Sequence, residues 1–264
     1  MSFSSKVVIV TGASSGIGAA TAILFAKEGA RVALVGRNEA KLGKVARQCA
    51  VYAAPLVIRA DIADELQAAT IVQKTIDHLG QLDVLVNNAA TNKLASTDDP
   101  NILKCFDLVL NTNLRSVVQL SNLAAPHLKA TKGNIINVSS IASTAIPFHS
   151  ILFYCVSTAG LDHYTRCNAL DLAPFGVRVN SVNPGPVVTE SLENTGRAKP
   201  GAGAQAWDSY KYMTALNKIS QPEEIADLIA FIASDKAKSI TGSNIVTDNG
   251  FLLKSNWNSV KWNY

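Results

Sequence analysis

The chain has 264 residues, of which 48% are hydrophobic and 17% charged, so it is long enough to bury a large core within one α/β domain. Its 24 basic and 20 acidic residues give a net charge of +4. They form no charge runs and no basic stripe interleaved with aromatic residues, which argues against nucleic-acid binding. With no apolar segment of about 20 residues and no basic N-terminal leader, a cytoplasmic protein without a membrane span is expected. The four cysteines lack C-x-x-C spacing, so the sequence predicts neither a metal site nor a disulfide.

Short apolar runs rich in β-branched residues alternate along the chain with longer segments of helical period. The runs predicted to be strands are residues 6–11, 31–35, 55–60, 83–87, 134–139, 177–183 and 244–248. The helices expected between them are 16–28, 39–49, 64–79, 113–129, 157–172 and 222–234. This alternation is typical of a parallel sheet covered by helices on both faces.

We therefore predict a single doubly wound Rossmann-type domain over residues 1–254, with a C-terminal tail at 255–264. The stretch at 194–205, NTGRAKPGAGAQ, is predicted to be mobile and to act as a lid within a substrate loop at about 189–217. In such a fold, ligands bind at the carboxyl ends of the strands near the switch in strand order. Residues at strand ends are therefore the candidates for chemistry.

The first predicted strand runs directly into a glycine-rich turn, TGASSGIG at residues 11–18, which opens a helix. Glycines let the backbone turn tightly and approach a pyrophosphate, whose charge is met by free N–H groups and the helix dipole. The G-x-x-x-G-x-G spacing after a strand therefore predicts a dinucleotide site. The residues expected to contact the cofactor here are Gly12, Ser14, Ser15, Gly16, Ile17 and Gly18.

The end of the second strand, Gly36-Arg37, bears on the choice of cofactor. An adenine ribose with both hydroxyls free favours an acidic residue at this position, whereas a 2′-phosphate needs a cation. Arg37 supplies a guanidinium where the acid is absent, so NADP(H) is preferred over NAD(H), although Arg37 could also be an ordinary solvated side chain. Ser14 and Ser15 could donate hydroxyls to the same phosphate, while the glycine turn itself carries no second basic residue.

The later strand ends carry further candidates. Asp61 and Ile62 follow the third strand, where they could meet the adenine, although Asp61 could equally cap the next helix. Asn88 and Ala89 follow the fourth strand and are small enough to let a dinucleotide lie close.

A hydroxyl, a phenol and a rigid turn are predicted to meet near the ends of the last strands. Ser140 follows the fifth strand, Tyr154 starts the next helix, and the sixth strand ends in the turn Asn183-Pro184-Gly185. Such a set can surround one carbonyl group, which indicates a reductase.

With these motifs the chain resembles the short-chain dehydrogenase/reductase family from Lys6 to Gly250. The resemblance implies hydride transfer between NADP(H) and an alcohol or carbonyl carbon. It implies that Tyr154 is the acid/base, that Ser140 holds the substrate oxygen, and that Asn113 supports a proton-relay water. It also implies a homotetramer or dimer. The further cofactor contacts expected from it are Tyr154, Thr158, Pro184, Gly185, Val187 and Thr189.

Three positions depart from the family pattern. Ala90 replaces a usual glycine and Asn249 interrupts a usual Asp-Gly-Gly, both at modest expected strain. At the third position, Thr158 stands where the family has a lysine, four residues after Tyr154 and on the same helix face. A unit charge about 4 Å away at an effective dielectric near 20 contributes roughly 4 kcal/mol, or about three units on the tyrosine pKa. Thr158 supplies no such charge, and no Tyr-x-x-x-Lys occurs elsewhere in the chain.

Two functions are therefore open. The first is an NADP(H)-dependent oxidoreductase that interconverts a secondary alcohol and a ketone and is impaired by Thr158, whether that residue is natural or an introduced substitution. The second is a catalytically silent pseudoenzyme that keeps the cofactor and acts in assembly or ligand binding. A lipophilic substrate is expected because mainly apolar residues flank the site, namely Phe148, His149, Phe153, Leu192, Trp207, Tyr210 and Met213.

Overall fold

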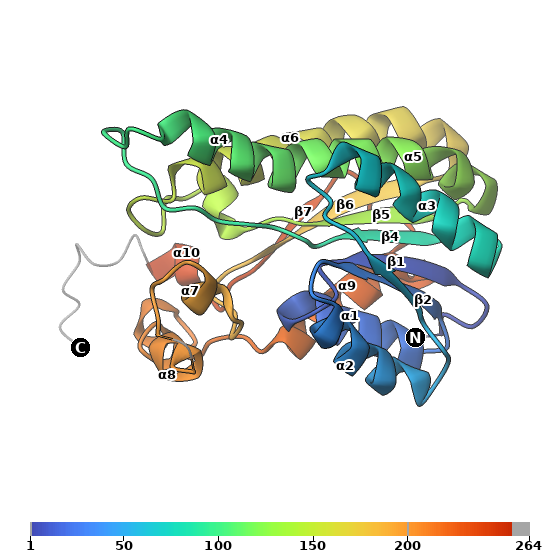
Figure 1. The fold of residues 1–264 in the computed structure, drawn as a ribbon, viewed down its shortest axis with the longest axis horizontal. Coiled ribbons are helices and arrows are strands. Elements are labelled where there is room, and N and C mark those ends of the chain that lie inside the picture. Colours follow the sequence, from blue (N-terminus) through green and yellow to red (C-terminus); the bar gives the residue numbers. More distant parts are fainter. Residues whose placement is uncertain (1, 200, 255–264) are drawn as a thin grey trace.

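The computed structural model describes residues 2–199 and 201–254, so the tail predicted at 255–264 lies outside the described residues. These residues form a single α/β domain around a seven-stranded sheet with the order β3-β2-β1-β4-β5-β6-β7 (Figure 1). Every neighbouring pair of strands is parallel. The order reverses between β1 and β4, which places the switch point beside the glycine turn that follows β1. The strands are β1 Val7–Thr11, β2 Arg31–Gly36, β3 Leu56–Arg59, β4 Val84–Asn87, β5 Asn134–Val138, β6 Arg178–Pro184 and β7 Asn244–Thr247.

Helices cover both faces of the sheet, with α1, α2 and α9 on one face and α3 to α6 on the other (Figure 1). They are α1 Gly16–Lys27, α2 Glu39–Ala50, α3 Glu65–Leu79, α4 Ile102–Leu110, α5 Ser116–Thr131, α6 Leu152–Leu172, α7 Ser191–Asn194, α8 Gly203–Asp208, α9 Pro222–Ala233 and α10 Phe251–Lys254. No helix of the described part is both long enough and apolar enough to cross a membrane.

The helix layers on both faces explain why a central strand such as β1 is apolar throughout instead of alternating. In β1, Val8 and Val10 belong to the buried cluster under α1, α2 and α9. Ile9, between them, belongs to the cluster on the opposite face. Successive side chains of a strand point to opposite faces, so a strand covered on both sides buries both sets, and β1 is apolar at all the positions between its ends.

The predicted strands and fold class are confirmed, whereas two helical regions differ from the prediction. The chain forms α4 where no helix was predicted, and α4 continues through a π-helical segment, Asn111–Arg115, into α5. A π-helical turn inserts one residue and shifts the apolar face of the helix. A prediction based on one uninterrupted 3.6-residue period therefore finds only the part of the helical region that follows this turn. For α6, the helix begins at Leu152, ahead of the predicted range 157–172, and Tyr154 lies in its first turn, as expected of a residue that starts this helix.

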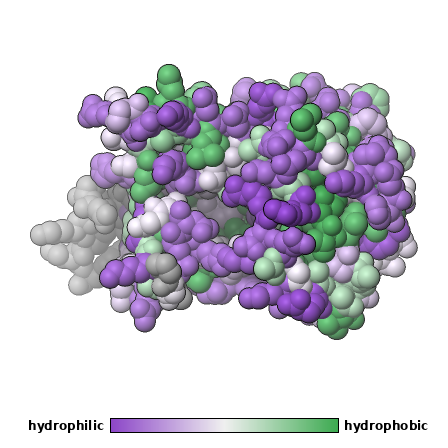
Figure 2. All heavy atoms as spheres, viewed as in Figure 1, coloured by the Kyte–Doolittle hydropathy of each residue, from purple (hydrophilic) through white to green (hydrophobic). Residues whose placement is uncertain are grey.

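The segment after β6 contains short helices where a loop was predicted. α7 and α8 lie on the same side of the molecule as the carboxyl ends of the strands (Figure 1). Figure 2, drawn in the same view as Figure 1, shows a hollow near the middle of the visible face, rimmed mainly by hydrophilic side chains. The segment therefore lies where it could cover a ligand bound at the sheet edge.

Candidate active site

The backbone of the glycine turn is packed so closely that its glycine positions leave little or no room for a Cβ atom. Gly12 and Gly16 have φ angles of +68° and +54°, in the left-handed region that favours glycine. A Cβ atom on Gly18 would lie 2.3 Å from the carbonyl oxygen of Gly12 and 2.4 Å from Nδ2 of Asn88. This bare backbone at the start of α1 fits the close approach of a pyrophosphate.

The turn is tied to the end of β4 across the switch point. The Thr11 hydroxyl accepts hydrogen bonds from the backbone N–H groups of Asn88 and Ala89, at 3.0 and 3.1 Å. The Asn88 amide in turn donates to the carbonyl of Thr11 at 2.9 Å. These bonds hold two of the predicted cofactor contacts directly against the glycine turn.

Arg37 and Asp61 meet at the ends of β2 and β3. Nη1 of Arg37 lies 3.5 Å from Oδ2 of Asp61, and the Arg37 side chain is 73% exposed. The other Asp61 oxygen accepts from the backbone N–H of Ala63 at 3.0 Å. The alternative interpretation of Asp61 as a helix cap is wrong, because Asp64 caps α3 by accepting from the N–H groups of Leu66 and Gln67.

Ser140 and Tyr154 come together as predicted, at the end of β5 and in the first turn of α6. Burial raises the pKa of Tyr154 above its ordinary value, and the hydrogen-bonding hydroxyl of Ser140 offsets part of that rise. The Ser140 oxygen also accepts from the backbone N–H of Ala142 at 3.1 Å, which fixes its position. At neutral pH the phenol therefore keeps its proton and can donate it.

The Thr158 side chain hydrogen-bonds to the backbone of its own helix. Its hydroxyl donates to the backbone carbonyls of Tyr154 and Cys155, at 2.9 and 3.1 Å, and the side chain is buried. This back-bonding is the usual habit of threonine within a helix. A hydroxyl occupied in this way provides no charge to the Tyr154 phenol one turn earlier.

Asn113 lies within the π-helical segment and uses its side chain to join two parts of the site. Its Oδ1 accepts from the N–H of Thr91 at 2.8 Å, while its Nδ2 donates to the carbonyl of Thr91 at 2.9 Å and to the hydroxyl of Ser157 at 3.1 Å. The amide thus holds the segment after β4 against α6. Its support of a relay water stays a prediction.

A buried polar network behind Ser140 was missed by the sequence analysis. Asn183 at the end of β6 donates to Oδ2 of Asp162 at 2.7 Å, to the carbonyl of Ser140 at 3.2 Å and to the hydroxyl of Ser143 at 3.1 Å. Ser181 donates to the other Asp162 oxygen at 3.3 Å. The sequence did contain one sign of this network. Asp162 is an acidic residue about two helical turns after Tyr154, and it lies on the buried face of α6.

The turn after β6 closes over the glycine turn. A Cβ atom on Gly16 would lie 3.0 Å from the methyl group of Thr189. The backbone at Gly185 is similarly crowded, since a Cβ there would lie 2.7 Å from that of Asp248. The Trp207 indole donates to the carbonyl of Thr189 at 2.8 Å, which ties α8 to this strand end. Pro184 and Val187 are buried beside these residues.

Aromatic rings connect the segment after β6 with the loop that precedes α6. Tyr210 packs edge-on against Phe148 at 5.4 Å between ring centroids, and it also contacts Trp207 at 5.5 Å. The Arg197 guanidinium lies over the Phe148 ring, 4.6 Å from its centroid. Phe153, also expected to flank the site, packs against Phe106 and belongs to a small apolar cluster with Cys105 and Val109.

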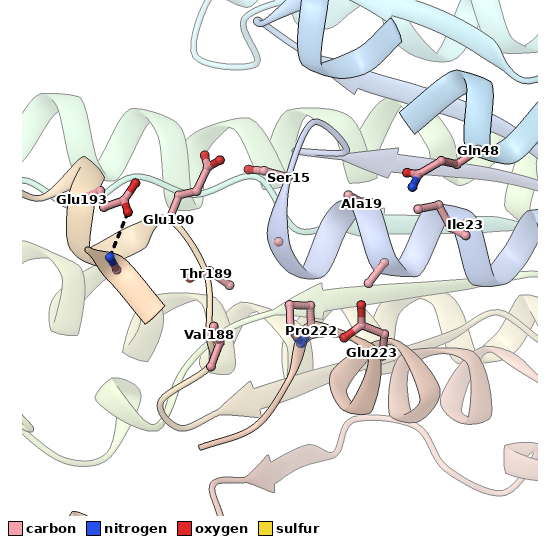
Figure 3. A pocket seen from close by; sticks show the side chains of 13 residues that line it. Ser15, Ala19, Ile23, Gln48, Val188, Thr189, Glu190, Glu193, Pro222 and Glu223 are labelled. Atoms are coloured by element: carbon pink, nitrogen blue, oxygen red, sulfur yellow. Dashed lines mark hydrogen bonds between the residues drawn. The ribbon is translucent and has the colours of Figure 1, made fainter. Parts of the chain in front are cut away.

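A cavity of about 440 Å³ lies beside the glycine turn and not around Tyr154. It runs between α1, the segment after β6 and the start of α9. Figure 3 shows Ser15 and Glu190 on one side of it, with Pro222 and Glu223 on the opposite side. The cavity thus adjoins the predicted phosphate contacts.

The departures at Ala90 and Asn249 are accommodated locally. Ala90 is exposed. Asn249 has a φ of +53°, a conformation that asparagine tolerates better than most residues. Its amide donates to the hydroxyl of Ser220 at 2.9 Å, which secures the turn after β7.

Comparison with known proteins agrees with this geometry. The family model described as Enoyl-(Acyl carrier protein) reductase matches residues 12–252. Meso-2,3-butanediol dehydrogenase of Serratia marcescens is 33% identical over 95% of this chain and 96% of its own length. L-xylulose reductase of Mesocricetus auratus is 35% identical over 93% of this chain and 96% of its own length.

Solved structures give the same result. A short-chain dehydrogenase/reductase of unknown function from Caenorhabditis elegans, solved with cofactor, has a TM-score of 0.88 at 37% identity, covering 95% of this chain and 96% of that one. A short chain dehydrogenase from Burkholderia cenocepacia in complex with NADP has a TM-score of 0.87 at 31% identity, covering 96% and 100%. The chain belongs to the short-chain dehydrogenase/reductase family.

Proposed function

We propose that the protein is an NADP(H)-dependent oxidoreductase that interconverts a secondary alcohol and a ketone, and that Thr158 impairs it. The observation that carries this proposal is the Ser140 hydroxyl placed against the Tyr154 phenol at the carboxyl ends of the strands, next to a glycine turn fitted to a dinucleotide. Relatives named as meso-2,3-butanediol dehydrogenase and L-xylulose reductase support the same reaction class.

Each side chain of the site has a separate role in the proposed reaction. The nicotinamide of the bound cofactor would supply or accept the hydride at the reacting carbon. Ser140 holds the substrate oxygen through its hydroxyl, and Tyr154 gives that oxygen a proton during reduction or removes one during oxidation. Asn183 and the network behind it fix the backbone at Ser140, so the hydroxyl is presented in one position.

NADP(H) is the proposed cofactor because Gly36 and Arg37 replace an acidic residue at the end of β2. The Arg37 guanidinium is exposed and makes a surface contact to Asp61, which can be given up for a phosphate at little cost. The NADP complex of the Burkholderia cenocepacia relative agrees with this choice. Asp61 and Ile62 remain the proposed neighbours of the adenine.

The proposed impairment follows from the contacts of Thr158. Its hydroxyl bonds to carbonyls of its own helix, so nothing at this position lowers the pKa of Tyr154 or holds the nicotinamide ribose. The substrate is proposed to be lipophilic because Tyr210 packs against both Phe148 and Trp207, which are among the apolar residues expected to flank the site. The segment at about 189–217 would form the lid over it.

The test is a panel of ketones and alcohols incubated with the Thr158→Lys protein and NADPH or NADP⁺. The panel should contain acetoin, 2,3-butanediol and L-xylulose, matched to the relatives, together with aromatic and long-chain ketones. Consumption of NADPH with any carbonyl supports the proposal. If the lysine variant binds NADPH yet turns over no member of the panel, the second candidate, a silent cofactor-binding pseudoenzyme, takes its place.

A further inference from the structure

An ion pair joins two segments that flank the glycine turn and are 149 residues apart in the sequence. Nζ of Lys41, in the first turn of α2, lies 2.5 Å from Oε2 of Glu190, in the segment after β6. The two side chains are 40% and 41% exposed. Exposed ion pairs contribute little to stability, so either partner can be exchanged at small cost.

Glu190 places its carboxylate beside the turn. It directly follows Thr189, whose methyl group packs against Gly16. Glu190 and Ser15 line the same side of the cavity beside α1 (Figure 3). A negative side chain thus lies near the start of α1, where the dipole and the bare backbone favour an anion.

Lys41 belongs to the same short segment as Arg37. The Asn38 side chain caps α2 by accepting from the N–H of Lys41 at 3.0 Å, and Arg37 immediately precedes that cap. The guanidinium stands at the end of β2, while the Lys41 ammonium reaches across to the segment that packs on Gly16. The glycine turn itself offers Ser14 and Ser15 but no cation.

We propose that Lys41 is the second cation of the 2′-phosphate site and that Glu190 competes with the phosphate for it. A phosphate monoester carries about two negative charges near neutral pH and accepts more hydrogen bonds than a carboxylate. It therefore displaces Glu190 from the ammonium when it binds. This proposal deepens the NADP(H) assignment above and rests on it.

The two members of the pair then have opposite effects on one cofactor only. Removal of the Lys41 charge weakens the binding of NADPH and leaves that of NADH unchanged, because NADH lacks the 2′-phosphate. Removal of the Glu190 charge frees Lys41 and tightens the binding of NADPH alone. General repulsion by Glu190 would act on the pyrophosphate, which both cofactors share, so NADH is an internal control.

The experiment titrates NADPH and NADH by cofactor fluorescence and 2′,5′-ADP by competition, at constant salt. The proteins are the parent chain, Lys41→Gln, Glu190→Gln, the double variant, and Lys44→Gln as a control on the exposed side of the same helix. We expect Lys41→Gln to weaken NADPH and 2′,5′-ADP about tenfold, the effect of one charge-assisted hydrogen bond. We expect Glu190→Gln to tighten both about threefold, from relief of one exposed ion pair, and to have no effect when Lys41 is already Gln.

Three results would overturn the proposal. Lys41→Gln and Glu190→Gln could both leave the NADPH titration unchanged while Arg37→Asp still removes the NADPH preference, in which case the cofactor assignment stands without Lys41. Glu190→Gln could tighten NADH as much as NADPH, which would make Glu190 a general repulsive charge. A parent chain that binds both cofactors equally would remove the NADP(H) assignment together with the proposal.

Discussion

At the scale of single residues, we propose that residue 158 sets the pH range in which Tyr154 loses its proton. Burial raises the pKa of the phenol. The hydroxyl of Thr158 hydrogen-bonds to two backbone carbonyls of its own helix. Alcohol oxidation requires the deprotonated phenol, so its rate should rise with pH through this pKa. In the parent chain that rise should lie above about pH 10, the ordinary range of a tyrosine.

Thr158→Lys should move this rise downward by about three pH units, because an ammonium near the phenol stabilises its charged form. The measurement is kcat for alcohol oxidation against pH. Thr158→Val, which removes the hydroxyl and adds no charge, should keep the high midpoint. Coincident midpoints for the lysine and valine variants would show that the ammonium does not reach Tyr154.

The proposed preference for NADPH also rests on a single residue, Arg37. The parent chain should bind NADPH at least tenfold more tightly than NADH, about 1.4 kcal/mol. Arg37→Asp should reverse that order, because a carboxylate repels the 2′-phosphate and accepts from the free ribose hydroxyls. The measurement is fluorescence titration of both reduced cofactors. Equal affinities for the parent would contradict the assignment.

At the scale of elements, Asn183 joins β6, α6 and the turn after β5. Asn183→Ala would leave the Asp162 carboxylate, which is 4% exposed, without its closest donor. Loss of one partner of a buried charge costs about 3 kcal/mol, so the midpoint of urea unfolding should fall accordingly.

The matched control is Asn183→Ala combined with Asp162→Asn, in which the stranded group is no longer charged. This double variant should recover part of the lost free energy of unfolding. If Asn183→Ala unfolds at the same urea concentration as the parent, the network does not hold these elements together.

The strands could be predicted because a sheet covered on both faces requires continuous apolar runs, as β1 shows. α4 could not, because the π-helical turn at Asn111–Arg115 breaks the period that identifies a helix. The glycine turn, Ser140 and Tyr154 carry local signatures. Two contacts could not be predicted because each joins segments that are far apart in the sequence: Asp162 with Asn183, and Lys41 with Glu190. A local sequence pattern does not indicate which distant polar groups meet in the fold.

At the scale of the whole molecule, the helices α4 to α6 present large apolar side chains to the exterior. Leu103, Leu108, Val118 and Val156 are 73%, 46%, 40% and 48% exposed. Exposed apolar side chains on neighbouring helices are typical of a protein interface when they form one contiguous patch. We predict a homodimer or homotetramer, for which sedimentation should give two or four times 28.0 kDa. A monomer at micromolar concentration would contradict this prediction.

The most direct test of the central claim compares kcat for carbonyl reduction by three proteins: the parent chain, Thr158→Lys and Thr158→Met. Methionine fills about the same space as lysine but carries no charge. The lysine variant should gain roughly a hundredfold or more in kcat. Its ammonium lowers the pKa of Tyr154, the proton donor, and holds the cofactor ribose in place. The methionine variant should stay at the parent rate, and Tyr154→Phe in the lysine variant should abolish the gain. Equal rates for the lysine and methionine variants, with NADPH bound in both, would contradict the account.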